Sequence, residues 1–358
     1  MSSGIRSLTL ADHPAMASTS HINIEDPAQL LPYLRGLGLI GDDDEPDFQV
    51  LTGGVSNRTV WVQRQKREDW VIKQALQKLR VPVDWFSDPE RIQREAAGLR
   101  CLGRIIPGHV PKVVFNDTQN NILTMTAVPQ PHFNWKTALL SGHTDVRFAQ
   151  SFGELLAKIH NAALCHPELA EEFAEQRFYE ELRLEPYYGY TATQAPKAAP
   201  FLTQLIEATR ARQYALVHGD YSPKNVLIHR ESLVILDYEV IHFGDPAFDI
   251  GFSLTHFLSK AHHLPARHDA FLDMASHYWR SYLLELAPHL HDTVRHLAVQ
   301  HTLACMLARV AGRSPLEYLD GIEREGQKRI ALDLMRQGIS EVPDLIEAVG
   351  AELGHIRE

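Results

Sequence analysis

The residues best suited to chemistry lie in one stretch, LVHGDYSPKNVLIHRESLVILDYE, at residues 216–239. His218, Asp220 and Asn225 follow one another in the spacing H-G-D-x-x-x-x-N, and Asp237 comes twelve residues after Asn225. A carboxylate such as Asp220 can accept the proton of a reacting hydroxyl. The side-chain oxygens of Asn225 and Asp237 are hard ligands of the kind that Mg²⁺ prefers. This combination of residue types is what phosphoryl transfer requires.

A simpler interpretation is that HGD is a turn before an ordinary strand and that Asn225 is a turn amide bonded to its own backbone. Asp237 argues against it, because this residue follows the apolar positions 233–236, where a buried strand is expected to end. An unpaired carboxylate there would be costly, whereas a bound Mg²⁺ would remove the difficulty. We therefore predict Asp220 as the catalytic base and Asn225 and Asp237 as metal ligands.

A glycine-containing turn in the first third of the chain suits phosphate binding. Residues 48–65 place Gly53 and Gly54 between two β-rich runs, and Ser56 follows closely. Backbone N–H groups at such a turn can approach phosphate oxygens without a Cβ in the way. We expect Gly53, Gly54 and Ser56 to contact the nucleotide, although a plain hairpin would show the same pattern.

Lys73 and Glu95 form a second candidate pair on the nucleotide side. Lys73 lies in the strand-like run VIKQ, and Glu95 lies in a helix expected at residues 88–102. A strand lysine that contacts the α- and β-phosphates and pairs with a glutamate of the next helix requires this order. Glu90 is the alternative partner, and a surface lysine with a solvated glutamate is the simpler explanation.

The remaining pattern is strand-rich in the first third of the chain and helix-rich afterwards, which predicts an α+β fold. Helices are expected at residues 26–39, 88–102 and 143–164, and an irregular loop at residues 186–200. The predicted organisation is a mobile leader at residues 1–22, a nucleotide-binding lobe at residues 23–128, and a helical lobe with the catalytic loop and acceptor site at residues 129–358.

Composition excludes several classes of protein. The chain has 358 residues, a net charge of −10 and 44% hydrophobic residues, so it can bury a large core but lacks the basic surface that nucleic acid requires. Its three cysteines, Cys101, Cys165 and Cys305, are far apart and predict no disulfide framework. We expect neither a signal peptide nor a membrane span, and therefore a cytoplasmic protein.

The segments VIKQ, REAAGLR, LVHGDYSPKNVLI, VILDYE and GDPAFDIGF resemble the aminoglycoside phosphotransferase and choline kinase superfamily. The resemblance implies a bilobal protein-kinase-like fold, ATP as phosphoryl donor and Mg²⁺ as cofactor. An A-P-E activation segment is absent from the sequence, which favours a small-molecule acceptor over a protein substrate.

The resemblance also implies roles for single residues. Asp220 would be the base, and Lys73 would contact phosphates. Backbone groups of Thr126 and Ala127 or Val128, in the run MTAV, would bond the adenine edge. Asp249 matches an aspartate that braces the catalytic loop, and Glu239 gives the D-Y-E run a similarity to choline and methylthioribose kinases.

The acceptor is the least determined part of the prediction. Carboxylates and aromatic rings of the helical lobe are suited to an amine or quaternary ammonium group, although a solvated helix face would look the same. The candidates are Glu180, Glu181, Glu185, Tyr187, Tyr188, Tyr190 and Trp279. We expect a kinase that phosphorylates a hydroxyl of a sugar, amino sugar or amino alcohol. The alternatives are a choline/ethanolamine- or methylthioribose-type metabolic kinase and a nucleotide-binding pseudokinase without activity.

Overall fold

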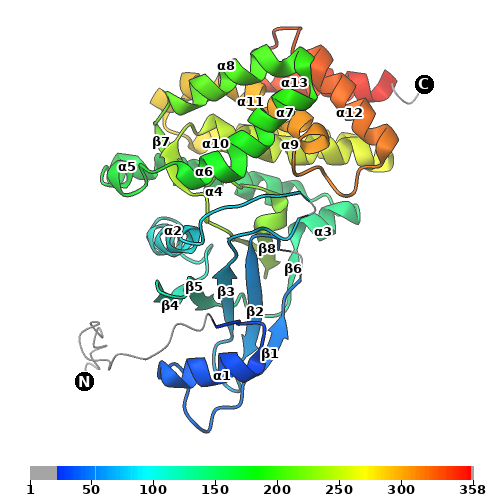
Figure 1. The fold of residues 1–358 in the computed structure, drawn as a ribbon. Helices are drawn as coiled ribbons and strands as arrows, with labels where there is room; N and C mark the ends of the chain where they lie inside the picture. Colours follow the sequence, from blue (N-terminus) through cyan, green and yellow to red (C-terminus); the bar gives the residue numbers. More distant parts are fainter. Residues whose placement is uncertain (1–21, 53, 82, 356–358) are drawn as a thin grey trace.

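The computed structural model describes residues 22–52, 54–81 and 83–355. An antiparallel sheet with two helices comes first, and a larger helix-rich part follows (Figure 1). This separation of strands from helices along the chain confirms the α+β prediction. Across the described ranges, no helix combines the length and apolar character needed to cross a lipid bilayer. Except for Ile22, the predicted leader lies outside the described residues.

The first part is built on a five-stranded antiparallel sheet with the order β1-β2-β3-β5-β4. Its strands are β1 (Asp47–Val50), β2 (Asn57–Gln63), β3 (Trp70–Ala75), β4 (Val113–Asp117) and β5 (Ile122–Thr126). Successive residues of a strand point to opposite faces. Trp70 and Ile72 of β3 are buried in a core shared with helix α1 (Pro27–Gly36), so Lys73 points to the other face of the sheet.

Helix α2 (Arg91–Ile105) confirms the helix predicted at residues 88–102. Asp88 precedes it, and its carboxylate accepts a hydrogen bond of 3.0 Å from the backbone N–H of Glu90. The helix packs against β3, β4 and β5 and buries Ile92, Glu95, Leu99 and Leu102. The buried face of the helix therefore holds two charged side chains, Arg91 and Glu95, among apolar ones.

Short strands connect the sheet to the helices. β5 ends at Thr126, and the next strand, β6 (His132–Asn134), pairs with β8 (Val226–His229), which pairs with β9 (Ser232–Ile235). The predicted lobe boundary at residue 128 falls in the connection between β5 and β6. A separate ribbon joins β7 (Ala215–Val217) to β10 (His242–Gly244). The strand, turn and strand predicted for residues 216–239 are therefore present.

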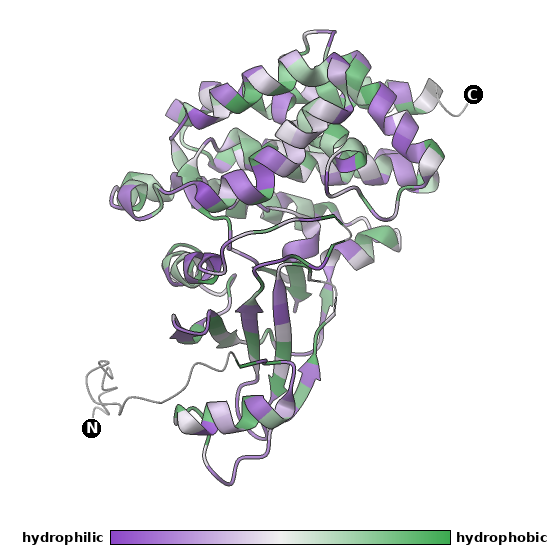
Figure 2. Cartoon of the chain, viewed as in Figure 1, coloured by the Kyte–Doolittle hydropathy of each residue, from purple (hydrophilic) through white to green (hydrophobic). Residues whose placement is uncertain are grey.

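The helix-rich part is organised around two helix pairs. Helix α4 (Val146–Cys165) packs along α10 (His268–Glu285), and α9 (Ala247–His263) packs along α11 (His291–Ala311). Hydrophobic and hydrophilic residues alternate along the outer helices, as expected for helices with one buried face (Figure 2). The other helices are α3 (Trp135–Leu140), α5 (Leu169–Glu172), α6 (Arg177–Tyr179), α7 (Tyr190–Gln194), α8 (Ala199–Arg210), α12 (Gly321–Leu334) and α13 (Val342–His355).

The irregular loop predicted at residues 186–200 is wrong, because this segment is mostly helical. A π-helix, Glu180–Gly189, runs directly into α7. The prediction treated the Pro and Tyr residues as loop formers. Tyr188 is instead fully buried, and its hydroxyl lies 2.8 Å from His301 Nδ1. Tertiary packing of these rings outweighs their weak local helix preference. π-Helices are rare and often occur at functional sites, and this one carries Arg183.

Candidate active site

A cavity of about 280 Å³ lies between the five-stranded sheet and a wall formed by β8 and the residues that follow β9. We call it the interlobe cavity. Most of its walls are apolar, with a few polar groups, which is typical of small-molecule sites. It is lined by Gln49, Leu51, Thr59, Trp61, Val71, Lys73, Glu95, Leu99, Pro111, Met125, Thr126, Ala127, Val128, Gln130, His132, Leu227, Leu236 and Asp237. Six of the predicted site residues are therefore among its walls: Lys73, Glu95, Thr126, Ala127, Val128 and Asp237.

Lys73 joins the sheet to the strands of the helix-rich part. Its Nζ lies 2.6 Å from Glu95 Oε1 and 3.0 Å from Asp237 Oδ1. The predicted partner Glu95 is thus the one that the structure provides. The alternative partner, Glu90, lies 3.1 Å from Arg177 Nη2 instead.

Burial and charge act against each other in this triad. Burial opposes the charge of Lys73, but Asp237 and Glu95 outweigh it and raise the pKa of Lys73 far above its usual value. Burial raises the pKa of Glu95 to about 7, because Lys73 is shared with Asp237 and compensates only in part. Burial also acts on Asp237, but Lys73 and Lys224 prevail and hold its pKa below the usual range. At neutral pH, Lys73 is a cation and Asp237 an anion.

The backbone turns sharply at Asp237, which has a φ of 72°. Few residues other than glycine adopt this left-handed region, and aspartate is among those that tolerate it. The preceding residue is tied to the catalytic loop, because the N–H of Leu236 donates a hydrogen bond of 2.9 Å to the carbonyl oxygen of Asn225. The turn places the Asp237 carboxylate at the cavity wall, with 21% of its side chain exposed.

The loop that carries Asp220 is braced by Asp249, as the sequence predicts. Its carboxylate accepts hydrogen bonds from the backbone N–H groups of His218 (2.7 Å) and Gly219 (2.8 Å). Gly219 has a φ of 78°, and a Cβ there would lie 2.8 Å from Val240 Cγ2. Only glycine fits this bend, so the spacing of the H-G-D run has a geometric cause.

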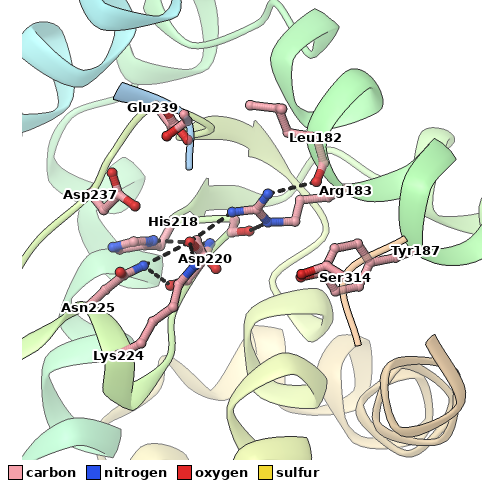
Figure 3. A network of polar contacts seen from close by, with 12 residues as sticks. Leu182, Arg183, Tyr187, His218, Asp220, Lys224, Asn225, Asp237, Glu239 and Ser314 are labelled. Atoms are coloured by element: carbon pink, nitrogen blue, oxygen red, sulfur yellow. Dashed lines mark hydrogen bonds and ion pairs between the residues drawn. The ribbon is translucent and has the colours of Figure 1, made fainter. Parts of the chain in front are cut away.

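Asp220 lies at the centre of a buried polar network (Figure 3). Its Oδ2 accepts a hydrogen bond of 2.8 Å from Asn225 Nδ2 and lies 2.8 Å from Arg183 Nη2 and 3.0 Å from Lys224 Nζ. Burial alone would raise the pKa of Asp220, but Arg183 and Lys224 outweigh it and lower the pKa. Asp220 Oδ1 is buried and accepts no hydrogen bond from the residues that the structure describes.

Two cations beside Asp220 were missed by the sequence analysis. Lys224 was recognisable, because it precedes Asn225 in the same motif and stands four residues after Asp220. Arg183 gave no such signal. It was hidden in the run EELRLE, which we read for its glutamates, and only the π-helix turns it inward to contact Asp220 and the Gly219 carbonyl oxygen at 2.8 Å.

The described residues of the glycine turn do not line the interlobe cavity. Gly53 lies outside the described residues, and neither Gly54 nor Ser56 lines the cavity. Ser56 is buried, its Oγ accepts a hydrogen bond of 3.1 Å from Asn57 Nδ2, and its carbonyl oxygen accepts one from Arg91. The predicted phosphate contacts of this turn therefore remain a prediction.

The predicted acceptor glutamates are engaged elsewhere. Glu180 pairs with Arg210, Glu185 pairs with Arg313, and a carboxylate oxygen of Glu181 accepts a hydrogen bond from Ser87.

The predicted aromatic candidates are also largely occupied. Tyr188 and Trp279 are buried, and Tyr190 lies beneath the guanidinium of Arg313. Tyr187 alone of the seven candidates appears in the network around Asp220, where its ring lies 5.8 Å from the Arg183 guanidinium (Figure 3).

Asn225 and Asp237 supply oxygens that fit Mg²⁺. Asn225 Nδ2 is committed to Asp220, and among the described residues its side-chain carbonyl oxygen accepts no hydrogen bond. In the part of the chain that is described, no three His, Cys, Asp or Glu side chains gather as a metal site. Mg²⁺ commonly takes one or two protein oxygens and completes its shell with water and substrate phosphates. This donor set therefore suits a metal that arrives with a nucleotide.

Comparison with known proteins identifies a family. The sequence profile of the Phosphotransferase enzyme family matches residues 47–289. Methylthioribose kinase of Geobacillus kaustophilus is 25% identical over 329 residues, which cover 78% of this chain and 83% of that kinase.

Solved structures share the fold. Plasmodium vivax ethanolamine kinase has a TM-score of 0.57 at 14% identity and covers 88% of this chain and 91% of its own. Amicoumacin kinase hAmiN, in complex with AMP-PNP, Ca²⁺ and Ami, has a TM-score of 0.57 at 14% identity, with 80% and 88% covered. The family profile spans more than half of the chain. The chain therefore belongs to the phosphotransferase enzyme family of small-molecule kinases.

Proposed function

We propose that this protein transfers the γ-phosphoryl group of ATP to a hydroxyl of a small molecule, with Mg²⁺ as cofactor. The observation that carries the proposal is the ion pair between Lys73 and Asp237, 3.0 Å long, at the wall of the interlobe cavity. A phosphate-binding cation and a metal-binding carboxylate must meet at one point for this reaction. Figure 3 shows Asp237 in the same view as Asp220, the proposed base.

The nucleotide would occupy the interlobe cavity, with its phosphates toward Lys73. Thr126, Ala127 and Val128 line the cavity, but two of their N–H groups are already used. The N–H of Thr126 donates to Lys112 and that of Ala127 donates to Asp69. We therefore assign the hydrogen bond to the adenine edge to the N–H of Val128, which has no backbone partner among the described residues.

The metal would be held by Asp237 and Asn225, and when bound it neutralises charge on the phosphate oxygens. Glu95 keeps Lys73 in place through its 2.6 Å ion pair. Asn225 has a second task, because its amide donates to both the carbonyl oxygen and the carboxylate of Asp220. Replacement of Asn225 is thus expected to disturb Asp220, and replacement of Asp220 is expected to disturb Asn225.

Asp220 would accept the proton of the acceptor hydroxyl. The acceptor oxygen forms a bond to the γ-phosphorus while the bond from that phosphorus to the β–γ bridging oxygen breaks, and ADP leaves. Because Arg183 and Lys224 lower its pKa, Asp220 is ionised at neutral pH and can orient the hydroxyl. The protein otherwise contributes positioning and charge, which account for most of the acceleration in such reactions.

Methylthioribose kinase activity is the second candidate. It is favoured by the relative of that name, which this chain matches over 83% of the relative's length, and by Glu239 two residues after Asp237. Glu239 is nevertheless buried and pairs with Arg91 at 3.1 Å. Methylthioribose therefore belongs in any acceptor panel.

The test is an ADP-release assay with ATP and Mg²⁺ across sugars, amino sugars, amino alcohols, methylthioribose and hydroxy acids, with mass spectrometry of the products. The expected result is a phosphorylated acceptor whose formation is lost in Asp220→Asn. Tight ATP binding without a phosphorylated product from any acceptor would contradict the proposal and favour the pseudokinase alternative.

A further inference from the structure

Positive charge gathers around Asp220 on the side of the helical elements. We define the basic cluster as Arg183, Lys224, Lys260 and Arg309. They come from the π-helix, the catalytic loop, α9 and α11 respectively. In Figure 3 the side chain of Arg183 lies between Asp220 and Tyr187, whereas Asp237 lies on the opposite side of Asp220. Arg183 and Lys224 thus contact Asp220 directly, and none of the four cations lines the interlobe cavity.

Tyr187 connects two of these cations. The guanidinium of Arg183 lies 5.8 Å from the centre of its ring and that of Arg309 lies 5.7 Å from it. Arg309 Nη1 donates hydrogen bonds to the Tyr187 hydroxyl at 3.0 Å and to Ser314 Oγ at 2.8 Å. Arg309 is only 7% exposed, its Nε is buried without a partner, and among the described residues it forms no ion pair. It is therefore a buried cation held only by neutral groups.

One face of α9 extends the cluster. Phe252, His256 and Lys260 recur every four residues and so lie along one side of the helix. Phe252 packs 6.0 Å from the Arg183 guanidinium, and its ring lies 5.3 Å from that of His256. Lys260 is fully buried and donates to the His256 carbonyl oxygen at 3.2 Å. The Lys260 ammonium lies 5.3 Å over the ring of Tyr318, with no ion pair among the residues described.

The charges of these groups act on one another. Burial and the charges of Lys136 and Arg309 lower the pKa of Lys260 to about 7. Burial lowers the pKa of His256 well below its usual value, and Lys260, Arg309 and Lys224 add to this effect. The His256 imidazole is therefore neutral, and its Nε2 is buried with no hydrogen-bond partner in the described part of the chain.

Negative charge is unevenly distributed over the cluster, because Asp220 pairs with Arg183 and Lys224, whereas no carboxylate among the described residues pairs with Lys260 or Arg309. Lys136 and Glu317 nearby pair with each other. Buried cations without anionic partners are costly, and an anion that binds among them removes that cost. A cationic acceptor would instead be repelled from this side of the base.

We infer that the acceptor is an alcohol that also carries an anionic group, a carboxylate or a phosphate, which binds to the basic cluster while its hydroxyl faces Asp220. The inference rests on the proposed function, because it names the acceptor class of the same site. Arginine suits both anions, since its planar fork matches carboxylate and phosphate oxygens. The inferred anionic acceptor replaces the expected amine or quaternary ammonium acceptor, because that expectation relied on glutamates that are engaged elsewhere.

The test compares acceptors that differ in one terminal group. Isothermal titration calorimetry would measure gluconate, glucitol and glucamine, and then glycerate, glycerol and 3-aminopropanediol, on protein loaded with AMP-PNP and Mg²⁺. Glycerol 3-phosphate separates phosphate from carboxylate recognition. The anionic member is expected to bind at least about tenfold more tightly than its neutral partner in one set or both, as a charge-assisted hydrogen bond provides. Equal or tighter binding of the neutral or amine members in both sets would overturn the inference.

Matched variants link that selectivity to the cluster. Arg309→Met is expected to lose the preference for the anion, whereas Arg309→Lys keeps most of it. Lys158→Met, which removes an exposed lysine elsewhere on the chain, should leave the preference unchanged. If Arg309→Met does not fold, Lys224→Met provides the same comparison, because that side chain is 44% exposed. Unchanged selectivity in a folded Arg309→Met or Lys224→Met variant would refute the assignment.

The two proposals can fail separately. Calorimetry of the anions needs no turnover and can be repeated without nucleotide, so it reports on the basic cluster alone. The ADP-release assay reports on phosphoryl transfer. Turnover that is confined to neutral or cationic acceptors would support the proposed kinase function and contradict the inference of an anionic acceptor.

Discussion

Arg183 Nη2 lies 2.8 Å from Asp220 Oδ2, and both side chains are almost fully buried. Asp220, the proposed base, is thus paired with the permanently charged guanidinium of Arg183. The ammonium of Lys224 lies 3.0 Å away as a second cation. Such a pairing keeps the carboxylate ionised and fixes its orientation, and it reduces the basicity of the oxygen that accepts the proton. The geometry therefore favours a role in which Asp220 orients the hydroxyl as much as it removes the proton.

Replacement of the base tests its role directly. Asp220→Asn keeps the shape of the side chain but removes its charge, so phosphoryl transfer is expected to fall by about 10²–10⁴-fold. Nucleotide affinity measured without Mg²⁺ should change little, because Asp220 does not line the interlobe cavity. Steady-state kinetics and fluorescent-nucleotide binding would measure the two effects. A variant with wild-type turnover would show that Asp220 is not the base.

Removal of Arg183 should change the pH dependence of activity. Arg183 and Lys224 lower the pKa of Asp220 from its ordinary value of 3.8. In Arg183→Met this pKa rises, so the acid limb of the kcat/KM profile should move to higher pH, whereas Arg183→Lys should retain the wild-type limb. The ionised Asp220 stabilises the fold above its unfolded pKa, and this contribution is lost as pH falls through the folded pKa. Acid unfolding of Arg183→Met should therefore begin at higher pH, and coincident profiles for both variants would contradict the role of this cation.

The Lys73–Glu95 pair should show strong coupling in stability. Lys73→Met leaves Glu95, which is 1% exposed, without its cation, and is expected to cost about 3 kcal/mol of unfolding free energy. The double variant Lys73→Met/Glu95→Gln should recover part of that loss, because position 95 is then neutral while Asp237 still lacks its cation. Urea unfolding measures both. Additive losses in the double variant would show that the ion pair is not the source of the effect.

Asp237 should determine the response to magnesium. In the wild type, Mg²⁺ is expected to strengthen ATP binding, and Asp237→Asn should weaken the Mg²⁺-dependent component by at least about tenfold. The exposed Asp273 provides a control, since Asp273→Asn removes the same charge elsewhere on the surface. An Asp237→Asn titration that matches the control would exclude Asp237 as a ligand.

Replacement of two helical glycines by alanine should change the stability of the protein in opposite directions. A Cβ at Gly153 in α4 would overlap the carbonyl oxygen of Tyr278 in α10, whereas at Gly103 in α2 the nearest atom is 3.8 Å away. Gly153→Ala is therefore expected to destabilise the protein by about 1–3 kcal/mol or more. Gly103→Ala should be neutral or stabilise it by up to about 1 kcal/mol. Thermal unfolding of the two variants would test whether α4 and α10 approach as closely as described.

The acceptor side shows most clearly where local patterns failed. The run EELRLE was read for its acidic residues, yet Glu180 and Glu185 pair outward with Arg210 and Arg313. Arg183 between them is the residue that turns toward Asp220. The helix period decides which side chains point toward the site. A π-helix follows neither the α-helical nor the strand period, so Arg183 points toward Asp220 where the glutamates were expected to line the acceptor pocket.

The sequence alone determined the class of chemistry and the residues that we propose to perform it. The spacing of Asp220 and Asn225 reflects one tight loop that only Gly219 permits, and Asp237 follows directly from the end of a buried strand, so a local pattern was sufficient for each. The tertiary structure alone decided what surrounds them. Arg183 and Arg309 reach the site from distant helices, and their meeting depends on how whole helices pack, which no short stretch of sequence encodes.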